Sequence, residues 1–172
     1  MIDEPKTMGL QDFFIDGLEE IYDAERKFTK CSAALGIAAV SEELKTILTS
    51  NSAITEKHMG HLDAILNRLS HPAGAGNCAL IACLSDKASE MMRRTETGTA
   101  LRDVAVLNLV QVIQHYKIAS YRNLVALATE MKHQKIATLL EECLSDEINT
   151  KTGLVEIGRR FIYPAAKAED LK

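Results

Sequence analysis

Six polar residues fall on the apolar stripes of long helical patterns, near the middle of each pattern. They are Glu25, Asn51, Thr55, Gln114, Lys117 and Glu147. Carboxylates and histidines that converge inside a four-helix bundle can bind two metal ions. Iron in such a site needs several anionic oxygen ligands. The first function to consider for these residues is therefore that of a di-iron or di-manganese centre.

Only Glu25 and Glu147 among the six are carboxylates, and no Glu-x-x-His pair lies on the later long patterns. We therefore expect no bound metal, no other cofactor and no catalytic residue. If a metal is bound, Glu25, His115 and Glu147 are its expected ligands. His115 follows Gln114 directly and so points roughly 100° away from it around a helix. A core histidine bonded to a carbonyl or a carboxylate is the better interpretation of His115.

Lys117 distinguishes this polar layer from a metal site. An unpaired buried charge is very costly, so a buried Lys117 needs a carboxylate partner. Our hypothesis is that Lys117 pairs with Glu25, and with Glu147, across the bundle centre. In the alternatives, Lys117 reaches the surface along its four-carbon stem, or Glu25 lies in water at the edge of its helix. We interpret His58 and His61 as exposed side chains rather than ligands.

Apolar residues with helical spacing predict four long helices and one short helix. In chain order these run from about Leu10 to Leu35, Glu42 to Leu69, Cys78 to Arg94, Leu101 to Met131 and Gln134 to Phe161. Gly36 and Pro164 are the expected stop signals of the first and last helices. No stretch alternates with period two. The sequence thus predicts an all-α four-helix bundle, with the short helix in the crossover between the second and third long helices.

The length of 172 residues indicates one domain, residues 1–172, with flexible tails at 1–8 and 164–172. A net charge of -4 argues against a nucleic-acid partner. No apolar segment approaches about 18 residues without a charge, so we expect no membrane span. The acidic N-terminus shows no secretory signal. We expect a cytoplasmic protein whose four cysteines are reduced thiols, packed as small apolar side chains.

Three segments of the chain read LQDFFIDGLEEIYDAERK, VIQHYKIASYRNLVALA and LLEECLSDEINT. These segments resemble the bacterial YciE/YciF family of ferritin-like stress-response proteins. The likeness extends from about Leu10 to Ile157, with the segments in the same order and at the same spacing. It implies a ferritin-like helical bundle, usually a homodimer, with no established enzymatic activity. It also implies a proposed di-iron site inside the bundle.

The resemblance assigns two of the family's metal ligands to Glu25 and Glu147. The other ligand positions differ in this chain. The family's HxxET reads Asn51 to Thr55 here, and its EHYE reads Gln114 to Lys117. The acidic residue four positions after Glu147 is replaced by Lys151. We therefore expect a member of the family with a degenerate metal site.

The expected function is that of a non-enzymatic protein with a structural or interaction role in stress physiology. The alternative is an oxidase or peroxidase with an atypical di-iron or di-manganese site on Glu25, His115 and Glu147. The number of carboxylates that converge on the bundle centre discriminates between the two. A second copy of the chain is the only partner that we expect, and the sequence names no other.

Overall fold

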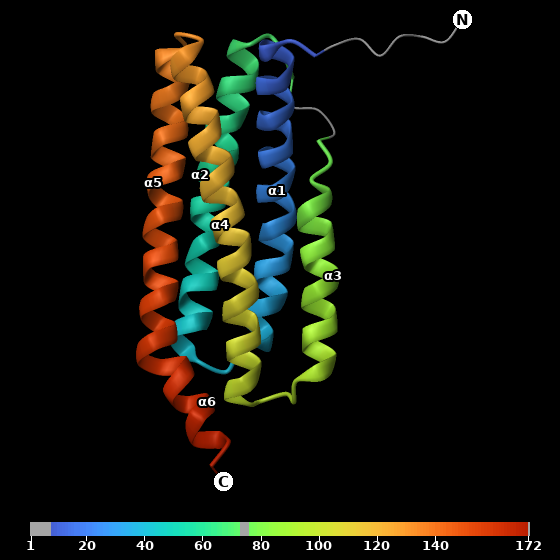
Figure 1. Cartoon of the computed structure of the whole chain (residues 1–172), viewed down its shortest axis with the longest axis vertical. Coiled ribbons are helices and arrows are strands. Elements are labelled where there is room, and N and C mark those ends of the chain that lie inside the picture. Colours follow the sequence, from blue (N-terminus) through green and yellow to red (C-terminus); the bar gives the residue numbers. More distant parts are fainter. Residues whose placement is uncertain (1–7, 73–75, 172) are drawn as a thin grey trace, which may run out of the picture.

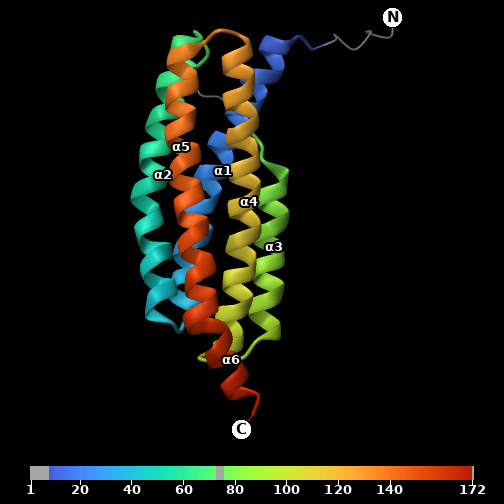
Figure 2. The ribbon, with the colours of Figure 1, turned by 60° about the vertical axis from the view of Figure 1, so that its left-hand side comes forward.

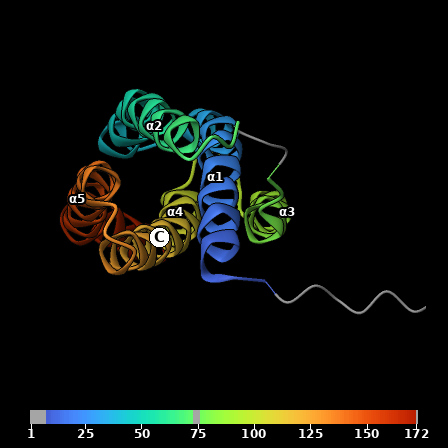
Figure 3. The same ribbon diagram turned by 90° about the horizontal axis from the view of Figure 1, so that it is seen from above.

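Four long helices stand side by side in this computed structural model, which describes residues 8–72 and 76–171. They are α1 (Leu10–Ala38), α2 (Glu42–Arg68), α4 (Ala100–Glu130) and α5 (Gln134–Ile157). Seen end-on in Figure 3, they occupy four corners, with α1 diagonally opposite α5 and α2 diagonally opposite α4. Each helix packs on two neighbours. The expected all-α, ferritin-like four-helix bundle is confirmed.

The short helix α3 (Ala79–Arg94) lies outside this bundle, against α1 and α4. It carries the chain from the end of α2 back to the start of α4, so these two diagonal helices run parallel. Only Ile81 and Ala88 of α3 are buried. The turn that joins α4 to α5 lies at the same end as the start of α1 (Figure 1 and Figure 2). The predicted crossover helix is confirmed.

Each long helix buries apolar side chains on both sides of a polar level. Along α1 the buried stripe consists of Phe14, Leu18, Ile21, Glu25, Phe28, Ser32 and Leu35. Each large apolar side chain in such a stripe stabilises the fold by about 1.5–3 kcal/mol through burial. The apolar ends of the stripes thus fix the helices around the polar level, and they position the site described below.

The first helix does not stop at Gly36, as we expected, but continues to Ala38. Asp103 of α4 sets the end instead, because its two carboxylate oxygens each accept a backbone hydrogen bond of 2.7 Å, from the N–H groups of Val40 and Ser41. Ser41 in turn caps α2 through its side chain. A glycine inside a helix costs only about 1 kcal/mol, so contacts outside the helix decide where it ends.

The last helix does not end before Pro164 either. Residues Gly158–Ile162 form a single π-helical turn, and α6 (Tyr163–Glu169) continues from it. Pro164 lies in the first turn of α6, where a missing N–H does no harm. Gly158 allows a close approach, since a Cβ atom there would lie 2.7 Å from Cδ2 of Leu107.

Residues that we expected to form a flexible C-terminal tail are therefore helical as far as Glu169. The Glu169 carboxylate accepts the backbone N–H of Ala100, at 2.8 and 2.9 Å to its two oxygens. It thereby satisfies a free N–H group at the start of α4. Of the expected N-terminal tail, residues 1–7 lie outside the described residues. In the described ranges, no helix combines the length and the apolar character needed to cross a membrane.

Candidate functional site

Lys117 of α4 lies at the centre of the bundle between carboxylates from two other helices. Its Nζ atom is 2.7 Å from Oε2 of Glu25 on α1 and 2.6 Å from Oε1 of Glu147 on α5, and all three side chains are 0% exposed. The ammonium also lies 5.0 Å from the centroid of the Phe28 ring. Neither alternative position, Lys117 at the surface or Glu25 in water, is correct. The structure contains the hypothesised pairing.

His58 of α2 adds a third helix-borne group to the same two carboxylates. Its Nδ1 atom lies 3.0 Å from Oε1 of Glu25 and 3.2 Å from Oε1 of Glu147. Its Nε2 atom lies 3.3 Å from Oδ2 of Asp146, a carboxylate that Lys57 also holds at 2.9 Å. The His58 side chain is fully buried. Our interpretation of His58 as an exposed side chain is wrong.

Neutral side chains also donate hydrogen bonds to the two glutamates. The hydroxyl of Tyr121 donates to Oε1 of Glu25 at 2.8 Å, and that of Thr55 donates to Oε2 at 3.5 Å. The amide of Gln114 donates to the Glu147 carboxylate and, at 3.0 Å, to the Glu147 backbone carbonyl. All four long helices therefore contribute to one layer of polar contacts.

Electrostatics keep Glu25 and Lys117 charged. Burial raises the pKa of Glu25, but the charge of Lys117 and the hydrogen bond and charge of His58 lower it below its ordinary value. Burial lowers the pKa of Lys117, whereas Glu25 and Glu147 raise it above its ordinary value. For both residues the charged neighbours outweigh the cost of burial, because the opposite charges lie in direct contact.

His58 is also charged at neutral pH. Burial lowers its pKa, but hydrogen bonds and charges from Glu147 and Glu25 raise it to about 9. Two cations, Lys117 and His58, therefore face two glutamates, and the formal charge of these four side chains is zero. The removal of one partner from a buried ion pair typically destabilises a protein by about 3–5 kcal/mol. The pairing of these charges avoids that cost.

The other polar residues that we singled out take different positions. Asn51 and Thr55 are buried on α2, and only Thr55 contacts a central glutamate. Asn51 Oδ1 and Gln114 Oε1 are buried without a hydrogen-bond partner among the described residues. His115 is exposed on α4, so it is neither the expected core histidine nor a ligand of the centre. His61 is partly exposed and lies 3.7 Å from the Cys143 thiol.

A spacing signal could have identified His58. It lies three residues after Thr55 on the apolar stripe of α2. In bundles that bind two metals, a glutamate and a histidine occupy such i and i+3 positions. Because the residue three positions before His58 is Thr55 and not a glutamate, a search for Glu-x-x-His does not find this histidine. The stripe position of His58 is a better guide than the motif.

The residues present do not fit a di-metal centre. Among the described residues, Glu25, His58 and Glu147 are the one group whose potential ligand atoms all lie within 4.8 Å of one another. A di-iron bundle uses four glutamates and two histidines. Here two glutamates and one histidine converge, and an ammonium lies within 2.7 Å of both carboxylates. A cation in the same place would repel any metal ion.

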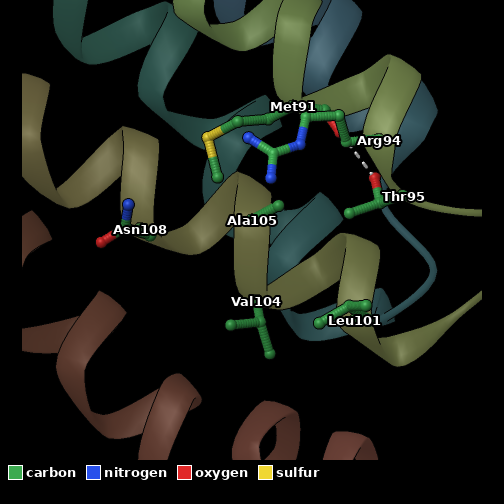
Figure 4. Close-up of a pocket in the computed structure, with 7 residues that line it drawn as sticks. All are labelled: Met91, Arg94, Thr95, Leu101, Val104, Ala105 and Asn108. Carbon is green, nitrogen blue, oxygen red and sulfur yellow. Dashed lines mark hydrogen bonds between the residues drawn. The ribbon is translucent and has the colours of Figure 1, made fainter.

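The surface cavity in Figure 4 is separate from this layer. It has a volume of about 410 Å³ and lies between α3 and α4, with Met91, Arg94, Val104 and Asn108 among its lining residues. None of the residues that line it contacts the central glutamates. All four cysteines carry free thiols. Burial raises the pKa of the Cys143 thiol to about 12, so this residue is a protonated packing residue.

The fold and the polar layer define the class of this protein: a ferritin-like bundle whose central level is occupied by ion-paired side chains. The family described as "Domain of unknown function (DUF892)" matches residues 9–165. The chain belongs to this family.

Named relatives agree with this assignment. Protein YciF of Escherichia coli K12 is 30% identical over 149 residues, which are 86% of this chain and 89% of that protein. The crystal structure of the E. coli stress protein YciF matches with a TM-score of 0.82 and 28% identity, over 88% of this chain and 95% of that chain. YcfI, described as "a putative structural protein" from Rhodopseudomonas palustris, matches with a TM-score of 0.83 and 30% identity, over 88% and 96% of the two chains.

Proposed function

We propose that this protein is a non-enzymatic, cytoplasmic member of its family, with a structural or interaction role in stress physiology. Support for the stress association comes from the similar E. coli protein YciF, which is described as a stress protein. Support for a structural role comes from the similar R. palustris protein, which is described as "a putative structural protein". The argument against catalysis comes from the bundle centre of this chain.

The contact of Lys117 with both central glutamates carries the proposal. In an oxidase or peroxidase of this fold, the carboxylates bind metal ions that react with oxygen or peroxide. Here Nζ of Lys117 lies 2.7 Å from Glu25 and 2.6 Å from Glu147, so a side-chain cation already neutralises these ligands. No redox-active group is needed to balance the site.

The metal content of the native protein tests the proposal. The chain is expressed in medium supplemented with iron and manganese and purified without chelator or affinity metal. Bound metal per chain is then measured by mass spectrometry. We expect clearly less than one metal per chain. One or two metals per chain would overturn the proposed metal-free centre.

The convergence of Glu25, His58 and Glu147 favours one second candidate, a di-iron or di-manganese oxidase or peroxidase with an atypical site. In that function His58 takes the place that we had assigned to His115. Stoichiometric metal in the native protein, together with metal-dependent consumption of oxygen or peroxide, would establish it. Metal without consumption would indicate a metal-bound structural protein instead.

A further inference from the structure

The short helix α3 has few buried side chains that hold it to the bundle. Two of its 16 residues, Ile81 and Ala88, are buried, whereas α4 buries 15 of its 31 residues. A helix of this length is only marginally stable alone in water, so its contacts with α1 and α4 keep α3 folded. Segments with few buried apolar contacts open before the rest of a protein unfolds.

Surface hollows lie along both sides of α3. One has a volume of about 550 Å³ and lies between α3 and α1, with Cys31 and Leu35 among the α1 residues that line it. The other is the cavity of about 410 Å³ in Figure 4, where Leu101 and Ala105 belong to the α4 wall. Atoms that face such hollows contact solvent, so they contribute little through burial. Packing along its length therefore stabilises α3 only weakly.

Polar contacts with Arg102 of α4 hold the C-terminal end of α3. The Arg102 guanidinium donates to the carbonyl of Met92 at 2.7 Å, to the hydroxyl of Thr95 at 3.3 Å and to the carbonyl of Thr95. Carbonyl groups at the end of a helix have no partner within the helix, so these bonds satisfy them. In the loop that follows, Gly98 has a φ of 85°, a left-handed conformation that glycine adopts without strain.

Asp23 of α1 holds the other end of α3. Its carboxylate is 1% exposed and accepts the backbone N–H of Cys78 at 2.8 Å. Nζ of Lys27 lies 2.7 Å from the same carboxylate and donates to the Cys78 carbonyl at 3.2 Å. The Cys78 thiol is buried, 3.3 Å from the Tyr116 hydroxyl. Polar contacts thus hold α3 at its two ends, and little holds it between them.

We propose that α3 is a hinged cover that opens as one unit while the four-helix bundle stays folded. The contacts made by Asp23 and Arg102 keep it closed. Opening makes apolar side chains accessible that are almost fully buried in the closed form, such as Leu35 of α1 and Ala105 of α4. The open form thereby presents an apolar surface that the closed form lacks. This cover lies outside the ion-paired centre, and its opening does not depend on whether that centre holds a metal.

Amide hydrogen exchange of the full-length chain, resolved by segment with mass spectrometry, tests the proposal. We expect the α3 amides to exchange much faster than those of α2 and α5, and at one common level of protection. Arg102→Met keeps most of the apolar stem but removes the guanidinium, and Asp23→Ala removes the carboxylate. Each variant is expected to raise the exchange of all α3 amides by about 10-fold or more, because hydrogen bonds to charged groups are lost.

Lys87→Ala is the matched control, since Lys87 lies on α3 but makes only an exposed pair with Glu90, at 3.3 Å. We expect it to leave the exchange of α3 nearly unchanged. Two outcomes would overturn the proposal. In the first, Arg102→Met and Asp23→Ala each affect only the end of α3 that they contact, as in fraying. In the second, the amides of α2 and α5 accelerate as much as those of α3, as in global unfolding.

A covalent lock between α1 and α3 is the second test. Cys31 and Ser85 line the same hollow from opposite helices. Burial raises the pKa of the Cys31 thiol, and the Ser85 hydroxyl partly offsets this rise, so the two side chains lie close together. Ser85→Cys therefore places a second thiol beside Cys31, in a Cys83→Ser background that removes an exposed thiol.

The oxidised variant is expected to exchange its α3 amides at least about 10-fold more slowly than the reduced form of the same variant, which is the matched control. Mass spectrometry of the intact chain verifies that the disulfide has formed. Equal exchange in the two forms would overturn the proposal. A disulfide that does not form under oxidising conditions would also count against it, because the closed position of α3 on α1 would then be wrong.

Discussion

Lys117 and His58 show how two side chains can balance a pair of buried carboxylates. Lys117 contacts both Glu25 and Glu147, and His58 contacts the same two residues from a third helix. Because each cation contacts both carboxylates, the loss of one cation removes a charged partner from Glu25 and from Glu147 at once. Effects of substitutions in such a network are not additive.

The charge of His58 makes the stability of the protein depend on pH. Its pKa is raised to about 9 in the folded chain, against about 6.5 in an unfolded chain. The charged form therefore stabilises the fold fully below about pH 6.5, and this contribution is lost as the pH rises to about 9. Each pKa unit corresponds to about 1.4 kcal/mol, so we expect a loss of about 3 kcal/mol. Urea denaturation at several pH values across this range measures it.

His58→Gln is the control for this pH dependence, because glutamine can donate a hydrogen bond but carries no titratable charge. Its unfolding free energy is expected to change little over the same range. Nearby groups stay protonated there, since burial raises the pKa of Cys143 to about 12 and that of Tyr121 well above its ordinary value. Equal pH slopes for the two proteins would refute the role given to His58.

For single residues, the sequence predicts which positions form the buried polar layer better than it predicts which side chains contact one another there. Glu25, Lys117 and Glu147 were recognisable because each interrupts an apolar stripe with a charge. His58 interrupts its stripe in the same way, but a histidine near the middle of a polar stretch gives no sign of whether a carboxylate faces it. The prediction that His115 is a core histidine or a metal ligand is wrong. It relied on the neighbouring Gln114, but adjacent residues point to different sides of a helix.

Among the helices, contacts between elements decide where each one starts and ends. Asp103 of α4 accepts the N–H groups of Val40 and Ser41 between α1 and α2, and Glu169 of α6 accepts that of Ala100 at the start of α4. Such caps come from residues distant in sequence. They join elements that are not consecutive in the chain, at one end of the bundle.

Asp103→Ala removes both acceptors from the α1–α2 connection. We expect it to lower the unfolding free energy by about 2 to 3 kcal/mol, because two partly buried N–H groups lose their partners. Thermal and urea denaturation measure the change. Asp86→Ala, at an exposed position on α3, is the matched control and should stay within about 0.5 kcal/mol of the unaltered protein. Equal stabilities of the two variants would contradict this role of Asp103.

The number, order and approximate bounds of the helices followed from apolar spacing alone. The wrong boundaries were those assigned from single residues, Gly36 and Pro164. Gly36 lies inside α1 because Asp103 fixes the chain only after Ala38. Pro164 lies inside a continuing helix because the π-helical turn before it places the proline in the first turn of α6. Neither contact is visible in the local sequence.

For the whole molecule, we propose that the chain forms a homodimer, as the family resemblance implies. The single chain leaves several large apolar side chains about half exposed at the start of α1, namely Met8, Leu10 and Phe13. Ile37, at the other end of α1, is 87% exposed. We expect a mass of about twice 18.9 kDa in sedimentation equilibrium at micromolar concentration. A mass of one chain at all concentrations would refute the dimer.

The ion-paired centre also affects how the amount of folded protein in the cell depends on metal availability. A metalloprotein reaches its stable form only after it has acquired its ion, so its amount follows the availability of that metal. In this chain the balancing cations, Lys117 and His58, are synthesised as part of the polypeptide. Under the proposed function, the folded protein would accumulate equally in iron-starved and iron-replete cells.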